Sequence, residues 1–397
     1  MWTCRRYTVK GARRIKSRTF QILTAALCLL FLLAGLGRTL LSPVTEVPYE
    51  NRPAKRCPAF SLAAFLRGSF QTELEDALAD QIPEASRLKK LYNIYDTSLA
   101  LPLISTLGRD GGYVGFRDIC FLRDMLVVPP VPLAEKEAAL RESGRRISAW
   151  AEASPDTDFY VYYIETDRDL NLETGEKTGL FDCLAVALAL PAGHVERLRT
   201  DSFDDYHRDF FRTDHHWNAD GSYRGYSELC ALLGVDALPL LGRHSVPACY
   251  RGTRAAGVEG VPAEDFAVNL YDYPDMTVTI PAGPIPDYGM QALFVAGELE
   301  SVSYGSVFGV DCGELVFDTG RTGKKLLVMG DSYDNAVVKP LAADFAKTYC
   351  VDLRSYASEL GRPFVMADYL QVHDIDTVLF VGGIDYFGAT LPTAEGG

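Results

Sequence analysis

The C-terminal quarter of the chain alternates between short apolar segments and longer segments of helical composition. Residues 324–329, 349–354 and 376–381 are rich in Val, Leu, Tyr and Phe and are predicted to be strands, and residues 334–348 and 363–370 between them are predicted to be helices. Strands joined by helices pair in parallel through right-handed crossovers, and the helices cover the sheet. The alternation therefore predicts an α/β fold whose ligand site lies at the carboxyl ends of the strands.

The preceding segments extend this pattern. A β-branched and aromatic strand is predicted at residues 159–166, and amphipathic helices are predicted at 65–90, 135–153 and 218–234, the first of them interrupted by a proline. Residues 237–302 carry short strands and Pro/Gly turns without a long helix, which predicts an irregular, β-rich insertion.

The N-terminus has the charge pattern of a membrane anchor. Residues 1–19 contain seven basic and no acidic side chains, and residues 20–41 form an apolar run interrupted only by Arg38. This run has about the ~20 residues needed to cross a bilayer, and the basic tail predicts that the N-terminus stays in the cytoplasm. The alternative is a cleaved signal peptide, whose apolar region is usually only ~7 to 15 residues, so an uncleaved single-pass anchor is favoured.

We therefore expect a basic cytoplasmic tail at 1–19, a transmembrane anchor at 20–41, a Pro-rich stalk at 42–60 and one extracytoplasmic α/β domain at 61–397. The whole chain has a net charge of −14 and the tail carries +7, so the exported part carries −21. Such an acidic body argues against a nucleic-acid partner, and 48% hydrophobic residues argue against global disorder. The nine cysteines form no C-x-x-C pair, which argues against a zinc or thioredoxin-type site.

A candidate nucleophile follows the first strand of the C-terminal alternation. Gly330, Asp331 and Ser332 form a tight turn between residues 324–329 and the predicted helix at 334–348. Ser332 is thereby presented at the edge of the sheet, beside backbone N–H groups that could stabilise an oxyanion. The alternative is that Ser332 only caps the following helix.

A serine nucleophile needs a base, and the chain has only six histidines. Two of them lie together in Thr213-Asp214-His215-His216-Trp217. If this segment is extended, Asp214 and His216 project on one side and His215 on the other. That geometry selects Asp214 and His216 as the carboxylate and imidazole of a triad and leaves His215 as a structural residue or a substrate contact.

The competing interpretation of the same segment is a metal site made of Asp214, His215 and His216. Adjacent histidines on opposite faces of an extended segment chelate poorly, and no other histidine lies at a favourable spacing. We therefore expect no metal and no other cofactor.

These motifs together resemble those of a known family. The strings FFRTDHHWNADGSYRGY, KKLLVMGDSYDNAVVKPLAADF and YCVDLRSY are similar to those of the DHHW family, membrane-anchored bacterial proteins like the alginate O-acetyltransferases of the SGNH-hydrolase-like class. The resemblance covers residues 20–387 and is weakest in the region 237–302. It implies an SGNH-hydrolase-like parallel sheet flanked by helices.

The resemblance also implies roles for individual residues. The aspartate and histidine of the family's D-x-H-W string fall on Asp214 and His216, and the motif serine falls on Ser332. Arg354 matches the arginine of a D-L-R string and could face the acyl group or the glycan, with an ion pair to Asp331 or Asp352 as the alternative. For two aromatic residues we weigh a sugar-facing wall against buried packing: Trp217 and Tyr333. The separate oxyanion Gly and Asn blocks of ordinary SGNH hydrolases are not evident.

The function implied is O-acetyl transfer to a cell-surface or secreted polysaccharide through an acyl-serine. Acetyl-CoA is cytoplasmic, so an exported enzyme requires a membrane-bound O-acyltransferase as the partner that supplies acetyl groups. The acidic body favours a neutral polymer as acceptor. The alternatives are an SGNH-type esterase that uses water as acceptor, and a non-catalytic glycan-binding or scaffold protein of a surface-polysaccharide complex.

Overall fold

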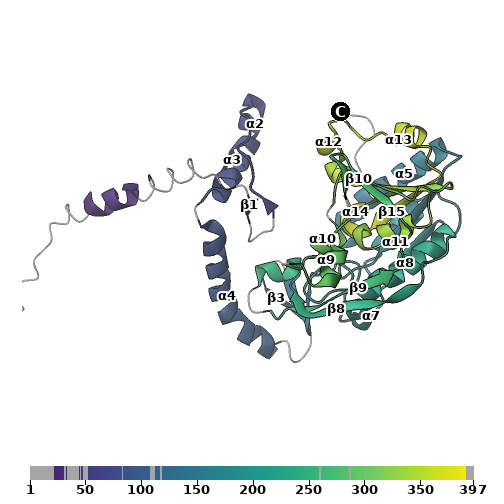
Figure 1. Cartoon of the computed structure of the whole chain (residues 1–397). Coiled ribbons are helices and arrows are strands. Elements are labelled where there is room, and N and C mark those ends of the chain that lie inside the picture. Colours follow the sequence, from purple (N-terminus) through teal and green to yellow (C-terminus); the bar gives the residue numbers. More distant parts are fainter. Residues whose placement is uncertain are drawn as a thin grey trace, which may run out of the picture. The chain divides into compact units, whose positions relative to one another are not determined.

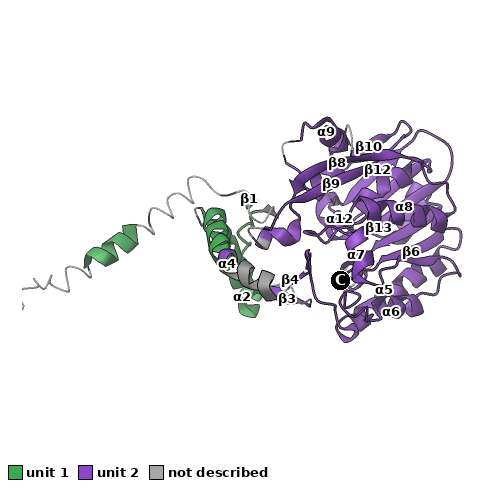
Figure 2. Cartoon of the chain, turned by 90° about the horizontal axis from the view of Figure 1, so that it is seen from below, with its two compact units in different colours: residues 1–96 green, residues 97–397 purple. Residues whose placement is uncertain are grey.

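The computed structural model describes residues 22–30, 33, 44, 46–47, 52–82, 84–107, 112–116, 119–258, 261–285, 288–299, 301–309 and 311–389. The chain divides into two compact units, residues 1–96 and 97–397 (Figure 2). The expected start of the α/β domain at residue 61 therefore precedes the boundary between the units. Much of the expected tail, anchor and stalk lies outside the described residues, and no helix in the described part is long and apolar enough to cross a membrane.

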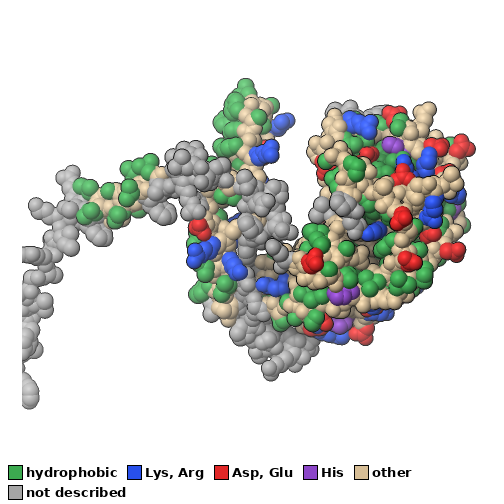
Figure 3. All heavy atoms as spheres, viewed as in Figure 1, with side chains coloured by type: hydrophobic (Ala, Val, Ile, Leu, Met, Phe, Trp, Pro, Cys, Tyr) green, Lys and Arg blue, Asp and Glu red, His purple; other side chains and the backbone are tan. Residues whose placement is uncertain are grey.

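The first unit is helical. The segment predicted as one interrupted helix at 65–90 is split into α2 (Leu62–Arg67), α3 (Ser69–Asp80) and the start of α4 (Ala85–Leu107). Gly68 separates the first two helices with a left-handed φ of 85°, a conformation that favours glycine. Apolar side chains gather on the surface of α2 (Figure 3), among them the exposed Leu62 and Leu66. The short pair β1 (Glu46–Val47) and β2 (Arg52–Pro53) completes the unit.

The second unit is built on an eight-stranded mixed sheet (Figure 1). Five neighbouring strands are parallel, and three more extend one edge of the sheet in antiparallel pairs. The predicted parallel sheet is thus confirmed for the five strands from β14 to β7, and the antiparallel extension was not predicted. In spatial order the strands are β11 (Gly283–Ile285), β10 (Thr277–Ile280), β12 (Glu314–Asp318), β14 (Lys347–Val351), β13 (Lys325–Gly330), β15 (Thr377–Gly382), β6 (Asp158–Ile164) and β7 (Val195–Leu198).

The sheet has a hydrophobic core on each face, because successive side chains of a buried strand point to opposite sides. In β13, Leu326 and Val328 join one core and Leu327 and Met329 join the other. The first core is covered by α8 (Ala219–Leu233) and α11 (Val338–Ala342). The second is covered by α5 (Leu133–Ala153), α6 (Leu180–Ala187), α12 (Leu353–Leu360), α13 (Met366–His373) and α14 (Ile384–Phe387).

The order of the strands and the placement of the helices that follow them put a topological switch point at β13. β13 lies between β14 and β15, and the helix that follows it packs on the face opposite to the helices that follow its two neighbours. Ligand sites in such sheets form where the chain leaves neighbouring strands toward opposite faces. Ser332 follows β13 directly and so stands at this place.

Two predicted segments differ from the structure. The long helix expected at 334–348 is a 3₁₀ turn, η3 (Asp334–Ala336), followed by the five residues of α11, because two β-branched residues and Pro340 disfavour a continuous helix. The expected insertion is partly integrated into the fold, since β10 and β11 join the large sheet.

The remaining described elements complete the second unit. A hairpin is formed by β8 (Leu240–Tyr250) and β9 (Glu264–Tyr271), with the 3₁₀ turn η2 (Thr253–Gly257) between them. The other elements are β3 (Val114–Phe116), β4 (Ile119–Leu122), β5 (Met125–Val127), α7 (Phe203–Asp209), α9 (Gln291–Ala296) and α10 (Tyr304–Phe308).

Candidate active site

The turn that carries Ser332 is tightly enclosed. β13 ends at Gly330, where a Cβ atom would lie 2.6 Å from Oδ2 of Asp334 and 2.7 Å from the backbone oxygen of Val381. Only glycine fits this approach between the end of β13, the following turn and β15. Ser332 itself is partly exposed, and its backbone N–H donates to no acceptor among the described residues. The hydroxyl and this N–H are therefore both available at the sheet edge.

The segment that carries the two histidines is a compact loop, so the extended conformation on which the choice of Asp214 and His216 was based is not present. Residues 212–216 form successive bends, closed by an isolated bridge between Phe210 and Trp217. The cause is a tertiary contact that the local pattern does not encode. The buried carboxylate of Glu264, on β9, accepts hydrogen bonds from the backbone N–H groups of Arg212 and Thr213 at 2.8 and 2.7 Å.

The loop brings the predicted triad residues together. Nε2 of His216 lies 2.7 Å from Oγ of Ser332, and Nδ1 of His216 lies 2.9 Å from Oδ1 of Asp214. A carboxylate only accepts hydrogen bonds, so Nδ1 carries the imidazole proton and Nε2 is left to accept the proton of the serine hydroxyl. Asp214 and His216 are both buried. The three side chains thus form one continuous hydrogen-bonded chain from a buried carboxylate to a partly exposed hydroxyl.

Asp214 is oriented by residues that the sequence analysis did not select. Its Oδ2 accepts hydrogen bonds from the hydroxyl of Tyr250 and, at 3.0 Å, from the backbone N–H of Thr253. A Cβ atom on Gly252 would lie 2.3 Å from Cβ of Asp214 and 2.6 Å from the backbone oxygen of Thr213. The end of β8 and the start of η2 therefore close around the carboxylate, and this contact requires glycine at position 252.

The surroundings of Asp214 and His216 set the charge that each side chain carries. Burial alone would raise the pKa of Asp214, but hydrogen bonds from His215 and His216 hold that pKa well below its usual range. Burial, together with the neighbouring His215, lowers the pKa of His216 below its ordinary value of 6.5 against the opposing attraction of Asp214. At neutral pH the site therefore holds an ionised carboxylate beside a neutral imidazole, which is the state that can take a proton from Ser332.

Aromatic packing fixes the ring of His216. The imidazole stacks on Tyr304 with ring centroids 3.8 Å apart and planes 8° from parallel. The Tyr304 hydroxyl accepts a hydrogen bond of 3.1 Å from Nε1 of Trp217, which is fully buried. Tyr333 is also mostly buried, and its hydroxyl donates to the backbone oxygen of His215 at 2.7 Å. Trp217 is therefore part of the packing that holds the loop and offers no surface to a sugar.

Arg354 lies apart from the hydrogen-bonded chain, in the first turn of α12. It pairs with Asp352 at 2.7 Å and with Asp311 at 2.6 Å, so the ion pair weighed as its alternative role is present. Asp331, next to the candidate nucleophile, is buried, and burial raises its pKa to about 7.

The metal site that the sequence left as an alternative has its ligand atoms close together. Those of Asp214, His215 and His216 all lie within 4.8 Å of one another. The two histidines therefore do not point to opposite faces as expected, since their ring centroids are 3.9 Å apart. The nitrogen atoms of His216 are, however, both engaged in the contacts to Asp214 and Ser332. A cation would have to displace one of these contacts in order to bind His216.

No family model and no curated protein matches this sequence. Solved structures with a similar fold are found at low identity. PatB1 of Bacillus cereus, in a structure with a sulfonyl adduct, matches with a TM-score of 0.54 and 19% identity, covering 72% of this chain and 98% of the PatB1 chain. A DHHW family protein from Eubacterium siraeum matches with a TM-score of 0.51 and 16% identity, covering 70% of this chain and 94% of the other.

The O-acetyltransferase domain of Pseudomonas putida AlgJ is also found, with a TM-score of 0.40 and 13% identity over 72% of this chain and 95% of that domain. The two higher-scoring likenesses span nearly the whole of the matched chains. The chain therefore shares its fold with a DHHW family protein of known structure, which confirms, for the fold, the resemblance inferred from its sequence motifs.

Proposed function

We propose that the protein is a serine-dependent O-acyltransferase that moves an acetyl group to a polysaccharide. The observation that carries this proposal is the chain of hydrogen bonds from Asp214 through His216 to Oγ of Ser332, at 2.9 and 2.7 Å. This arrangement supplies a nucleophile, a base and an orienting carboxylate, and triads are defined by these spatial roles whatever their order in the sequence.

The proposed reaction has two halves. Oγ of Ser332 attacks the carbonyl carbon of the acyl donor while Nε2 of His216 takes the hydroxyl proton, and Asp214 stabilises the imidazolium that forms. The bond between the acyl carbon and the donor's leaving group then breaks, His216 gives its proton to that group as it departs, and the acyl-serine remains. The backbone N–H of Ser332 has no other acceptor among the described residues and is the proposed donor to the oxyanion. A sugar hydroxyl then attacks the acyl-serine, His216 takes its proton, and the proton returns to Oγ as the ester is released.

The proposal includes location and partners. The basic tail at 1–19 and the apolar run at 20–41 support an anchored protein whose catalytic unit is extracytoplasmic. Such an enzyme would receive its acetyl groups through a membrane-bound O-acyltransferase. PatB1, which has a similar fold, forms a sulfonyl adduct, and sulfonyl reagents react with activated nucleophiles such as an activated serine.

The test is to trap the covalent intermediate on the full-length protein. Incubation with p-nitrophenyl acetate, or with a sulfonyl fluoride, is expected to label Ser332 in a peptide map by mass spectrometry. His216→Ala should abolish the label, while Ser358→Ala, an exposed serine on α12, should leave it unchanged. Folded protein that remains unlabelled at high reagent concentration would rule out the acyl-serine. Label that is lost to water equally fast with and without sugars would identify an esterase instead.

A further inference from the structure

A pocket of about 250 Å³ lies beside the hydrogen-bonded chain and is not used by it. His215 and Tyr333, the neighbours of the base and of the nucleophile, form one side of the pocket. The other side comes from the segments that follow β6 and β15, at the carboxyl edge of the sheet. These segments contribute Thr166, Asp167, Arg168, Gly383, Ile384 and Asp385.

The charges that line this pocket are paired with one another. Arg254 binds Asp167 at 2.8 Å at its buried end, and Arg168 binds Asp385 at 2.9 Å at its rim. Arg254 also donates to the backbone oxygen of Leu126 and to the hydroxyl of Tyr206, each at 2.9 Å. Among the described residues that line the pocket, no arginine is therefore left without a carboxylate partner for its charge.

Hydrogen-bonding capacity nevertheless remains. Nε of Arg168 is buried and has no partner in the described part of the chain, and an unmet buried donor is costly unless a ligand or water meets it. The ring of His215 is 39% exposed beside the pocket. The pocket thus offers polar groups, but each arginine that lines it is already paired with a carboxylate. Such a pocket suits an uncharged ligand that carries hydroxyl groups.

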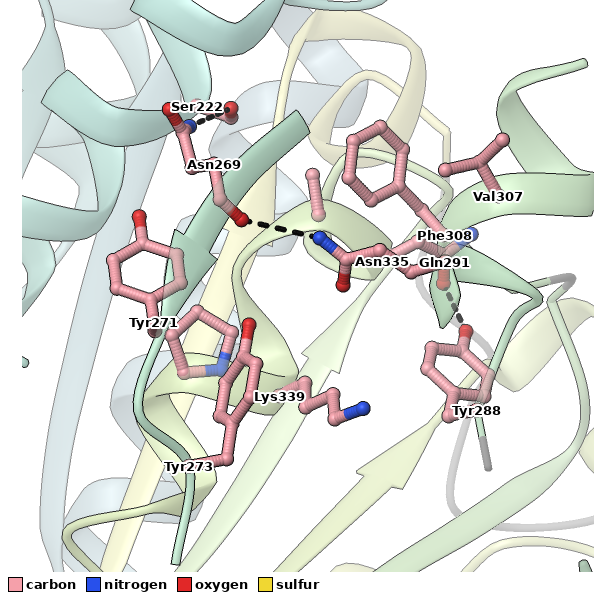
Figure 4. A pocket seen from close by; sticks show the side chains of 12 residues that line it. Ser222, Asn269, Tyr271, Tyr273, Tyr288, Gln291, Val307, Phe308, Asn335 and Lys339 are labelled. Carbon is pink, nitrogen blue, oxygen red and sulfur yellow. Dashed lines mark hydrogen bonds between the residues drawn. The ribbon is translucent and has the colours of Figure 1, made fainter. Parts of the chain in front are cut away.

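A second depression, shown in Figure 4, has a different character. Its volume is only about 20 Å³, and several of its polar side chains bond to one another or to the backbone. Tyr288 donates to Asn335, and Gln291 donates to the backbone oxygen of Asn269 at 3.1 Å (Figure 4). These side chains are therefore already engaged within the fold, and the depression is too small to hold a sugar.

We propose that the pocket beside His215 is the acceptor subsite, and that it takes an uncharged sugar residue. This inference rests on the proposed acyl transfer. A sugar held between Arg168 and His215 would present a hydroxyl to the acyl group on Ser332. A uronic acid in the same place would bring its carboxylate into a pocket whose two arginines are already paired with Asp167 and Asp385, so no free cation would offset the cost of removing that carboxylate from water.

The experiment separates the two half-reactions on the full-length protein. Acylation is measured as the burst of p-nitrophenol from p-nitrophenyl acetate, and transfer is measured as the decay of acyl-Ser332 with methyl glucoside or methyl glucuronoside, which differ only at C6. Methyl glucoside is expected to accelerate the decay, and methyl glucuronoside is expected to be at least about tenfold less effective. Equal effects, a preference for the uronate, or decay no faster than in buffer with either sugar would overturn the proposal.

Two variants test whether the acceleration by methyl glucoside arises in this pocket. Arg168→Gln is expected to lower the efficiency of methyl glucoside at least about tenfold, as expected for a lost hydrogen bond to a substrate, and to leave the burst within about twofold. Val128→Phe should fill the pocket with the same outcome, since Val128 lines it. Arg145→Gln and Val186→Phe, on exposed positions of α5 and α6, are the matched controls.

The two proposals fail in different ways. If Ser332 is never acylated, the acyl-transfer function is wrong. If Ser332 is acylated normally but Arg168→Gln leaves the sugar dependence unchanged, only the assignment of the pocket is wrong. A slower burst in Arg168→Gln with unchanged transfer would place the acyl donor in the pocket, which also overturns the proposal.

Discussion

The two halves of the candidate site are built by different means. Ser332 is placed by regular structure, because it follows the buried strand β13 at the edge of a parallel sheet. Asp214 and His216 are placed by an irregular loop whose shape depends on hydrogen bonds from distant elements. A strand end tolerates changes elsewhere in the molecule, whereas the loop depends on several individual contacts. The base should therefore be far easier to misplace than the nucleophile.

The largest effect is expected from Gly252→Ala. The new Cβ would lie 2.3 Å from Cβ of Asp214, so the loop must move away from β8. Overpacking of this kind costs about 1 to 3 kcal/mol of stability, and a shift of about 1 Å in the base lowers the acylation rate about 100-fold. The p-nitrophenol burst and the thermal midpoint measure the two effects.

Gly115→Ala is the control for that substitution, because nothing lies within 4 Å of its Cβ position on β3. It should leave both the burst and the thermal midpoint unchanged. If Gly252→Ala acylates Ser332 at the normal rate, the loop does not depend on the close contact between Gly252 and Asp214.

A smaller effect is expected from Glu264→Gln. The carboxylate accepts bonds from two backbone N–H groups and from the hydroxyl of Thr213, whereas an amide offers one oxygen and turns an NH₂ toward the donors. Leaving one buried donor unmet costs about 1 to 3 kcal/mol, measured by urea unfolding, and the acylation rate should fall about tenfold.

Glu152 is exposed on α5, and Glu152→Gln tests whether the loss of one acidic charge by itself changes the stability or the acylation rate. Equal stability of the Glu264→Gln and Glu152→Gln variants would show that Glu264 does not shape the loop.

The smallest effect is expected from His215→Ala, and it concerns pH. Only neutral His216 can take the serine proton, so the acylation rate rises with pH through the pKa of His216, which lies below 6.5. His215 contributes to that lowering, so its removal should raise the pKa of His216 and shift the acidic limb of the pH–rate profile to higher pH.

Acylation rates measured between pH 4.5 and 8 define the acidic limb of the pH–rate profile. Above neutral pH, the acylation rate of the variant should differ little from that of the unchanged protein. His207→Ala, an exposed histidine on α7, should leave the limb in place. A limb that moves to lower pH in His215→Ala would contradict the electrostatic role of this residue.

Local sequence signals were sufficient for several of the regular elements. The helix from Ala219 to Leu233 begins with Asn218 as its N-cap and ends at Gly234 in the left-handed conformation, as the pattern predicts. The strands at β6, β13, β14 and β15 were predicted within a few residues, because continuous apolar runs report burial on both faces of a sheet.

The same signals failed where distant side chains decide the conformation. Tyr250, Thr253 and Glu264 hold the loop of Asp214, yet they lie 36 to 51 residues further along the chain, in the region where the sequence carried least signal. The pocket at Arg168 was missed for the same reason, since Arg168 and Asp385, which pair on one side of it, are 217 residues apart in the sequence.

The sequence by itself determined the α/β class, the helices and strands that alternate in its C-terminal part, and the choice of Ser332, His216 and Asp214 as candidates. Hydrophobic periodicity and turn chemistry are local properties of a chain, so they can be recognised without its fold. Only the tertiary structure decided how the three side chains meet, why His215 lies beside them and where a pocket remains. Those outcomes depend on close packing and hydrogen bonds between elements that are distant in sequence, and no local pattern specifies such contacts.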